Sequence, residues 1–564
     1  MRLSVRLFVL VILASITASA QLKAPFNSTV DPFSIKAGSS FVASGGVTGM
    51  SAATSSKAKL IAADIREAEE IIKRNHFDGS SLNTANMTTS ALGGMLRALD
   101  PHSNYYDAAE WKDLMEEERS SYSGIGASIA NFTQNGVTDT YVLSTFPGSP
   151  AARAQLRFGD KIVAINGERV AGKESDVVRD KIRGENGTAF RLTVERAATN
   201  RIETVDIRRG RVAQPSIPDA YILRPGVGYI DLSEGFNYTT SDEFDAAYTE
   251  LQRQGARSLI LDLRGNGGGI VDQAVKVAEK FLPTGTLILT QRGRARIDNR
   301  VWRSGNTTPE TMPLVVLVDE DTASASEIVA GAFQDDDRAL IVGERTFGKG
   351  LVQSVIGLPA GAGLTLTCAR YLTPSGRSIQ RDYSKLDLYD YFNHKTPSAA
   401  ADSSFIAHTL TDRIVFGGDG IQPDEVIKSD TLTQAEAALL DPLFFFVREA
   451  ANGRIVGQEN YRATSFSFGR RVLRVDLPIS DSLVAAFNEF VAKNADVPAE
   501  TLKAETAFIR LRLRYELAIA SFGTVSANQV LAEDDPQVAK AIAALPRAEQ
   551  LAQLAARAYQ HAIR

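Results

Sequence analysis

The sequence predicts an α/β fold with helical segments at both ends of the chain. Between residues 203 and 380, short apolar runs alternate with stretches whose apolar residues recur at helical spacing. Two of the runs, at 258–264 and 313–319, are apolar almost throughout, which is typical of strands covered on both faces. Polar or glycine-rich loops follow both runs, so we expect any chemistry at the carboxyl ends of these strands.

The composition argues against several classes of function. The 564 residues carry a formal net charge of −5, which disfavours nucleic acid as a partner. With one cysteine, Cys368, the chain has neither an internal disulfide framework nor a cysteine-based zinc site, and none of its five histidines lies in an H-E-x-x-H motif. We therefore expect no metal ion and no cofactor.

The first residues have the pattern of a secretory signal peptide, residues 1–20. Two arginines precede an apolar run at 7–14, and Ala18-Ser19-Ala20 is a small-residue cleavage site. The run is shorter than the roughly 20 apolar residues that a membrane-spanning helix needs. We expect cleavage before Gln21 and an exported, soluble mature protein in the periplasm or another extracytoplasmic space.

A leader and a helical segment are expected before the α/β region. Residues 21–58 should form a flexible leader, because the second half of this stretch is rich in serine, alanine and glycine. Residues 59–120 should be mainly helical, since their apolar positions recur at helical spacing. The second of the two helical stretches ends at L-D-P-H-S (99–103), where the proline stops it.

Residues 121–198 differ in character from the helical segment before them. A loop with two glycines, Gly124, Ile125 and Gly126, leads into alternating apolar residues, and Asn166-Gly167 has the composition of a hairpin turn. The segment resembles a PDZ domain. Backbone N–H groups of such a loop can hold the terminal carboxylate of a peptide, while the adjoining strand edge pairs with the peptide backbone.

Ser324 lies where a predicted strand meets a predicted helix, and two interpretations compete there. The motif S-A-S-E fits a helix capping box. A serine at a helix N-terminus is also well placed for nucleophilic attack, because free N–H groups such as that of Ala325 can hold an oxyanion. Gly268 or Gly269 in the preceding glycine-rich loop would supply the second donor. Position alone does not distinguish Ser324 from Ser326.

Lys349 is a candidate base for such a serine. The segment G-E-R-T-F-G-K-G (343–350) satisfies most of a phosphate-binding loop, but Gly350 replaces the hydroxyl residue that would hold magnesium, and no helix follows. The apolar neighbours Phe347 and Leu351 disfavour a solvated surface lysine. Burial lowers the pKa of a lysine, and a base that acts near neutral pH needs a drop of about three units.

His102 is the residue through which a conventional triad could arise. It lies in L-D-P-H-S, where we favour a structural role at a helix end. A Ser–His–Asp arrangement remains an alternative, since triads are assembled in space rather than in sequence.

These motifs together resemble the C-terminal processing peptidases, also called tail-specific serine proteases. The resemblance covers roughly residues 60–425. Besides the PDZ segment, the matching motifs in order are L-D-P-H-S (99–103), D-L-R-G-N-G-G-G (262–269), T-A-S-A-S-E-I (322–328), G-E-R-T-F-G-K-G-L-V-Q (343–353) and A-R-Y-L-T-P-S-G-R-S-I-Q (369–380).

The resemblance implies that Ser324 rather than Ser326 is the nucleophile, that Lys349 is the general base and that Gln353 orients the lysine. It also implies a crotonase-like βα protease core at 199–428. The function expected from it is that of a serine endopeptidase that cleaves protein substrates near their C-termini, with the PDZ domain capturing the free C-terminus.

Two departures from the family pattern and one rival function accompany this prediction. Gly267 stands where the family commonly has proline, and residues 381–419 form an insertion that could be a lid, a partner surface or a disordered loop. Residues 429–564 are expected to be helical, to pack on the core or to form a homo-oligomer, and an adaptor protein is a further candidate partner. The rival is a catalytically inactive PDZ scaffold, for which peptide binding is the whole function.

Overall fold

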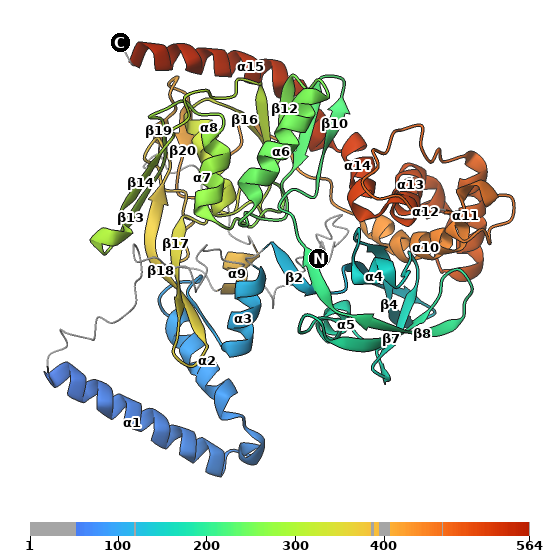
Figure 1. Cartoon of the computed structure of the whole chain (residues 1–564), viewed down its shortest axis with the longest axis horizontal. Coiled ribbons are helices and arrows are strands. Elements are labelled where there is room, and N and C mark those ends of the chain that lie inside the picture. Colours follow the sequence, from blue (N-terminus) through green and yellow to red (C-terminus); the bar gives the residue numbers. More distant parts are fainter. Residues whose placement is uncertain (1–51, 118–119, 385–387, 394–405, 465, 563–564) are drawn as a thin grey trace.

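The computed structural model describes residues 52–117, 120–384, 388–393, 406–464 and 466–562. The predicted signal peptide lies outside the described residues. The described part contains a central α/β unit, a separate mainly β domain and helices at both ends of the chain (Figure 1), so the predicted fold class is confirmed.

A six-stranded sheet forms the centre of the α/β unit. In spatial order its strands are β10 (Asp219–Arg224), β11 (Val227–Asp231), β12 (Ser258–Asp262), β15 (Leu314–Val318), β16 (Leu340–Gly343) and β21 (Glu425–Val426). All neighbouring strands are parallel except β10 and β11. The two runs that the sequence marked as buried are β12 and β15, and β15 is buried along its whole length.

Helices cover both faces of this sheet, which explains why its central strands are apolar throughout. On one face, Phe244 and Phe333 belong to a core shared by three helices and the sheet. These helices are α6 (Thr240–Arg253), α7 (Val271–Glu279) and α8 (Ala325–Asp335). On the opposite face, α15 (Pro536–Ala562) packs against strand residues such as Val315.

A smaller antiparallel sheet lies beside the core, and the sequence analysis did not predict it. Its strands are β1 (Asn104–Tyr106), β18 (Gly363–Leu372), β13 (Leu287–Gly293) and β14 (Arg300–Arg303), with β17 (Leu351–Gly357) also paired to β18. Because β1 follows L-D-P-H-S directly and pairs with β18, this sheet brings that motif beside β17 and β18.

The segment predicted to be a PDZ domain forms a curved antiparallel sheet with two short helices. Its elements are β3 (Ala127–Gln134), β4 (Val137–Thr145), α4 (Pro150–Arg153), β5 (Lys161–Ile165), β6 (Glu168–Arg169), α5 (Ser175–Ile182), β7 (Ala189–Glu195) and β8 (Ile202–Arg208). The boundary predicted at residue 198 is one strand too early, because β8 pairs with β7 along its whole length. A ribbon of β2 (Ser121–Gly124) and β9 (Gly210–Ala213) joins this domain to the core.

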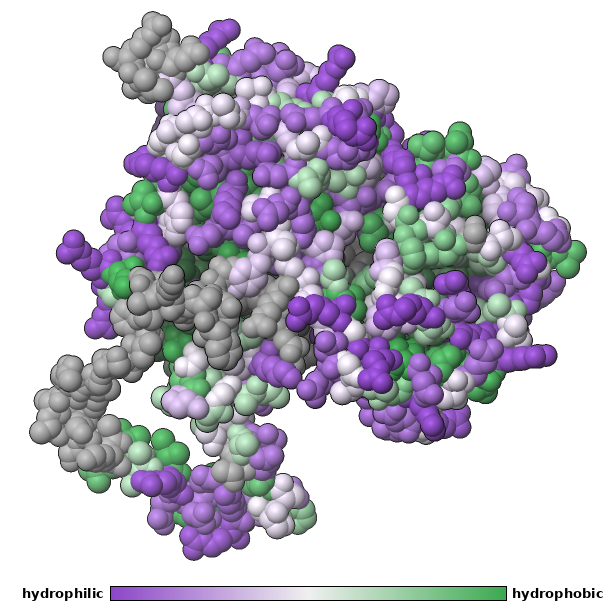
Figure 2. Space-filling view, in the orientation of Figure 1, coloured by the Kyte–Doolittle hydropathy of each residue, from purple (hydrophilic) through white to green (hydrophobic). Residues whose placement is uncertain are grey.

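The N-terminal helices include one that extends away from the rest of the molecule, α1 (Ala52–Asn75) (Figure 1). The flexible leader predicted up to residue 58 is therefore wrong for residues 52–58, where alanine and lysine favour a helix. Both apolar and polar side chains of α1 reach the surface, at lower left in Figure 2. The helices α2 (Thr84–Arg97) and α3 (Ala108–Glu117) lead to and from β1.

The C-terminal region is helical, as predicted, and packs on the PDZ segment. Its helices before α15 are α10 (Gln434–Ala451), α11 (Asp481–Asn494), α12 (Ala499–Ala504), α13 (Thr506–Phe522) and α14 (Thr524–Asp534). The ring of Phe132 in β3 stacks on Phe444 in α10 with centroids 3.6 Å apart. Arg448 Nε donates a hydrogen bond to the carbonyl oxygen of Gly159 at 2.8 Å. Within the described ranges, no helix has the length and apolar character to cross a membrane.

Candidate active site

Ser324 connects β15 to α8 in an unusual backbone conformation. Its φ of 58° and ψ of −114° lie in a region that residues other than glycine rarely adopt. An N-cap residue ordinarily has extended dihedral angles, so helix capping alone does not account for this conformation. Strain of this kind costs about 1–3 kcal/mol and is found mainly at functional sites. The backbone therefore favours the nucleophile interpretation.

A buried carboxylate, that of Glu327, joins the chain segments that carry Ser324 and Lys349. Its Oε2 accepts the backbone N–H of Ser324 at 2.8 Å and that of Lys349 at 2.9 Å. Its Oε1 accepts the N–H of Gly348 at 2.8 Å and the hydroxyl of Thr346. Burial raises the pKa of Glu327, and these hydrogen bonds oppose the rise by favouring the carboxylate. The capping box that competed with the nucleophile interpretation is thus present, and it helps to build the site.

Tyr371 ties the same two segments together from their carbonyl side. Its hydroxyl lies 3.0 Å from the carbonyl oxygen of Ser324 and 2.7 Å from that of Lys349. The backbones of the two residues are therefore held side by side by one carboxylate and one hydroxyl. The sequence predicted no role for Tyr371, and it indicated Glu327 only as the acid of the capping box in S-A-S-E.

Lys349 is buried, with 4% of its surface exposed. Desolvation lowers its pKa from 10.5 to about 7, and the negative charges of Glu327 and Asp100 work against this drop. A neutral amine is consequently well populated at physiological pH, which is the form that can accept a proton.

Gln353 lies on β17 and belongs to a chain of polar contacts. Its Nε2 donates to Thr367 Oγ1 at 3.2 Å, and Thr367 Oγ1 donates to Asp100 Oδ1 at 3.0 Å. Its Oε1 is buried and has no hydrogen-bond partner among the residues that the structure describes. Asp100 and Thr367 were not predicted as site residues, because β1 and β18 bring them together from distant parts of the sequence.

His102 is buried beside this site but bonds to a residue of the insertion. Its Nε2 lies 2.9 Å from the hydroxyl oxygen of Tyr391. Burial, together with the positive charges of Lys349 and Arg381, lowers its pKa well below the usual value, so the ring is neutral. This arrangement agrees better with the structural role than with a triad.

The glycine-rich loop after β12 approaches Ser324 closely. A Cβ atom on Gly268 would lie 2.6 Å from Ser324 Cβ and 2.8 Å from the backbone nitrogen of Ala325, so a larger residue does not fit there. The N–H of Gly268 donates to Asn266 Oδ1 at 2.9 Å. The predicted oxyanion donors Ala325 and Gly268 are therefore neighbours, and one of them is already engaged in this conformation.

The predicted carboxylate-binding loop lines a groove on the PDZ segment. The groove lies between β2, β3 and α5, and Tyr122, Gly124, Ile125, Gly126, Ala127, Ile129, Arg179, Ile182 and Arg183 line it. The guanidinium of Arg183 lies 5.2 Å from the centroid of the Tyr122 ring. Two cations, Arg179 and Arg183, thus lie at a groove that could receive a carboxylate.

Comparison with known proteins identifies the family. Residues 226–388 match Peptidase family S41, and residues 142–196 match a PDZ domain. A carboxy-terminal-processing protease of Bartonella bacilliformis is 37% identical over 299 residues, which are 52% of this chain and 66% of that protein. A carboxyl-terminal-processing protease of Picosynechococcus sp. is 36% identical over 320 residues, 56% of this chain and 75% of that protein. The chain belongs to peptidase family S41. Among solved structures, a photosystem II D1 C-terminal processing protease is 30% identical to this chain. The match covers 64% of this chain and 86% of that protease, with a TM-score of 0.33.

The first departure from the usual family S41 pattern is Gly267, where the loop has room for a Cβ atom. A Cβ atom added at Gly267 meets no other atom within 4 Å, and its φ is not positive. The site around Ser324 therefore does not depend on glycine at this position.

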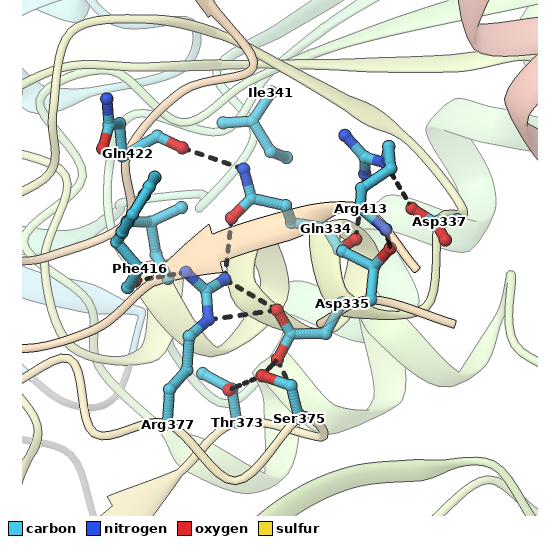
Figure 3. A network of polar contacts seen from close by, with 12 residues as sticks. Gln334, Asp335, Asp337, Ile341, Thr373, Ser375, Arg377, Arg413, Phe416 and Gln422 are labelled. Carbon is cyan, nitrogen blue, oxygen red and sulfur yellow. Dashed lines mark hydrogen bonds and ion pairs between the residues drawn. The ribbon is translucent and has the colours of Figure 1, made fainter. Parts of the chain in front are cut away.

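The second departure, the insertion at 381–419, is anchored to the core at its C-terminal end. There a hairpin of β19 (Ile406–His408) and β20 (Ile414–Phe416) precedes β21. Arg413 pairs with Asp424. Figure 3 shows that Arg413 also pairs with Asp337, and that Arg377 pairs with Asp335 and donates to the carbonyl oxygen of Phe416. This end of the insertion is thus an integral part of the protease core.

The insertion also places the short helix α9 (Leu388–Phe392) against the site. Tyr391 is almost fully buried, and its ring centroid lies 5.5 Å from that of His102 and 5.6 Å from that of Phe347. The guanidinium of Arg381 lies 4.5 Å from the Phe347 ring and 4.8 Å from the Tyr391 ring. Of the three roles considered for the insertion, its described residues fit a cover over the site best.

Proposed function

We propose that the protein is an exported serine endopeptidase in which Ser324 and Lys349 form the catalytic dyad, and that it cleaves protein substrates near their C-termini. The observation that carries this proposal is the joint attachment of Ser324 and Lys349 to Glu327 and Tyr371, with the lysine buried. A strained serine beside a largely neutral amine is what a Ser–Lys dyad requires.

The mechanism is acyl transfer in two steps. In the first, neutral Lys349 takes the proton of Ser324 Oγ, and Oγ bonds to the carbonyl carbon of the scissile peptide. The tetrahedral adduct collapses when the lysine ammonium returns a proton to the leaving amine, which departs and leaves an ester on Ser324. In the second step, Lys349 takes a proton from water, the hydroxide attacks the ester, and the acid product leaves as Ser324 Oγ regains its proton.

The developing oxyanion requires backbone donors close to Ser324. Ala325 occupies the first position of α8, where the N–H has no partner within the helix. Gly268 is the second donor, and its N–H exchanges Asn266 Oδ1 for the oxyanion when substrate binds. The N–H of Ala325 lies at the positive end of α8, and the N–H of Gly268 lies in a glycine-rich loop. Both positions favour a negative charge.

The PDZ domain supplies the selection of C-termini. An extended peptide adds to the edge of the sheet, and its terminal carboxylate lies at Gly124, Ile125 and Gly126 with Arg179 and Arg183 nearby. The names of the relatives, which refer to carboxy-terminal processing, support the same assignment. Export rests on the pattern of residues 1–20 in the sequence.

Three alanine variants distinguish this function from its rivals. We expect Ser324→Ala and Lys349→Ala each to abolish cleavage of an unstructured protein with an apolar C-terminal tail, while the tail still binds. If the protein is a catalytically inactive PDZ scaffold, cleavage and tail binding should be the same in all variants as in the natural chain. A Ser–His hydrolase predicts that His102→Ala abolishes cleavage and that Lys349→Ala does not.

A further inference from the structure

Asp100 begins a chain of hydrogen bonds that reaches Gln353. The carboxylate is 6% exposed and is held by the L-D-P-H-S turn, where it accepts the N–H groups of His102 and Ser103, each at 2.8 Å, and the Ser103 hydroxyl at 2.7 Å. Ser103 Oγ in turn accepts the backbone N–H of Thr367 at 3.0 Å. The turn is thereby fastened to β18 at the residue that faces Gln353.

The chemistry of these groups fixes the direction of the hydrogen bonds. An ionised carboxylate only accepts, so the single proton of Thr367 Oγ1 must go to Asp100. The lone pairs of the hydroxyl then remain for a donor, and the group that faces them on Gln353 must be its NH₂. The carbonyl oxygen of the amide consequently points to the other side, where it is buried and, within the described ranges, has no hydrogen-bond partner.

We propose that Asp100 and Thr367 are positioning residues that hold the amide of Gln353 with its carbonyl oxygen available to the amine of Lys349. The inference rests on the proposed function, since it assigns a role to Gln353 only if Lys349 is the base. The carbonyl end of an amide accepts hydrogen bonds from both the amine and the ammonium of lysine. A flipped amide would present its hydrogens to the ammonium, or would occupy the lone pair with which the neutral amine takes a proton. Burial makes an unpaired acceptor costly, which favours its use during turnover.

The decisive variants lie on one strand and change one hydroxyl each. Thr367→Val removes the hydroxyl in the chain, whereas Thr365→Val removes a buried hydroxyl two residues away that has no hydrogen-bond partner in the described chain. We expect Thr367→Val to lower kcat about tenfold with KM within twofold, because it loses the orientation of a group beside the base. Thr365→Val should leave both constants unchanged, and Thr367→Ser should restore activity.

A double-mutant cycle tests whether Thr367 acts through Gln353. Gln353→Ala should lower kcat by a similar factor, and Thr367→Val combined with Gln353→Ala should lower it no further than either change alone. If the kcat losses of the two single variants multiplied in the double variant, the proposal would be overturned, because the two residues would then act independently. Equal losses in Thr365→Val and Thr367→Val would also overturn it, since strand packing would then explain both.

The pH profile of Asp100→Asn distinguishes a positioning role of Asp100 from a purely structural one. Its negative charge raises the pKa of Lys349, so its removal should shift the acidic limb of the kcat/KM profile to lower pH, in addition to lowering kcat. An unshifted limb would contradict a connection to Lys349. If Lys349→Ala itself retained activity, the proposed function would fail; if it abolished activity while Thr367→Val did not reduce it, only the positioning chain would fail.

Discussion

At the scale of single residues, Lys349 lowers the stability of the folded chain. Its folded-state pKa of about 7 lies below its unfolded value of 10.5, so between these pH values the unfolded state binds the proton that the folded state has released. Stability therefore rises with pH across this window. Below pH 7 the folded chain carries the full free-energy cost of burying Lys349.

Lys349→Met should consequently stabilise the protein while abolishing proteolysis. The expected gain at pH 7 is about 4 kcal/mol, from a pKa difference of about 3.5 units. Unfolding by denaturant at several pH values measures it, and the gain over the natural chain should be largest at pH 6 and shrink toward pH 10. A gain that does not depend on pH would show that the lysine is not desolvated in this way.

The hydroxyl of Tyr371 offers a second prediction at the same scale. Tyr371→Phe removes the link between the carbonyl oxygens of Ser324 and Lys349, and a shift of about 1 Å in a catalytic group can cost about 100-fold in rate. We expect a loss of at least about tenfold in kcat, with a change of about 1 kcal/mol in unfolding free energy. The matched control is Tyr221→Phe, whose buried hydroxyl has no partner among the described residues. Equal kinetics for the two variants would remove Tyr371 from the site.

The sequence alone indicated a candidate nucleophile and a candidate base, but not the residues that hold their backbones. Ser324 and Lys349 lie in short motifs with local signals, a strand-to-helix junction and a lysine among apolar residues. Tyr371 and Thr367 lie on β18, which reaches the site through antiparallel pairing with β1 and β17. Contacts of this kind depend on register between distant segments, and a single sequence carries no direct signal for them.

At the scale of elements, α9 packs beside the segment that carries Lys349. Its Tyr391 packs on His102 and on Phe347, two residues before Lys349. The sequence could not predict this packing, because the insertion is polar and has no regular period around a five-residue helix. Water exclusion by α9 would contribute to the desolvation that lowers the pKa of Lys349.

Tyr391→Ala should therefore move the pH dependence of the enzyme. Water that enters the vacated space favours the ammonium form, so the acidic limb of kcat/KM should shift to higher pH. Tyr389→Ala, which truncates an exposed tyrosine on the same helix, is the control and should leave the limb in place. If both variants kept the natural profile, α9 would have no part in tuning the base.

At the scale of the whole molecule, the C-terminal helices pack on both the PDZ domain and the central sheet. One core contains residues of β4, α10 and α13, while α15 packs on the central sheet. The sequence predicted that residues 429–564 are helical and pack on the core or form a homo-oligomer, but an apolar helix surface does not specify its partner. The packing of these helices on the PDZ domain was for that reason not predicted.

Phe444→Ala should loosen this attachment without unfolding the protease core. Phe444 is fully buried and stacks on Phe132, and truncation of a buried phenylalanine costs about 3–5 kcal/mol. Hydrogen exchange should show faster exchange of the amides in β3 and α10 and unchanged exchange in β12 and β15. Phe468→Ala, at a phenylalanine that is 37% exposed, should change neither set. Exchange that rises equally in the central sheet would contradict a separate attachment.

The central claim, that Lys349 activates Ser324, is tested most directly by labelling the serine with a fluorophosphonate at different pH values. We expect one label per chain, on Ser324 and not on Ser326, with a rate that rises with pH around a midpoint of about 7, the pKa of Lys349. In Lys349→Met the label should be lost or its rate should no longer rise around pH 7. A label on Ser326, or an unchanged pH profile in Lys349→Met, would contradict the dyad.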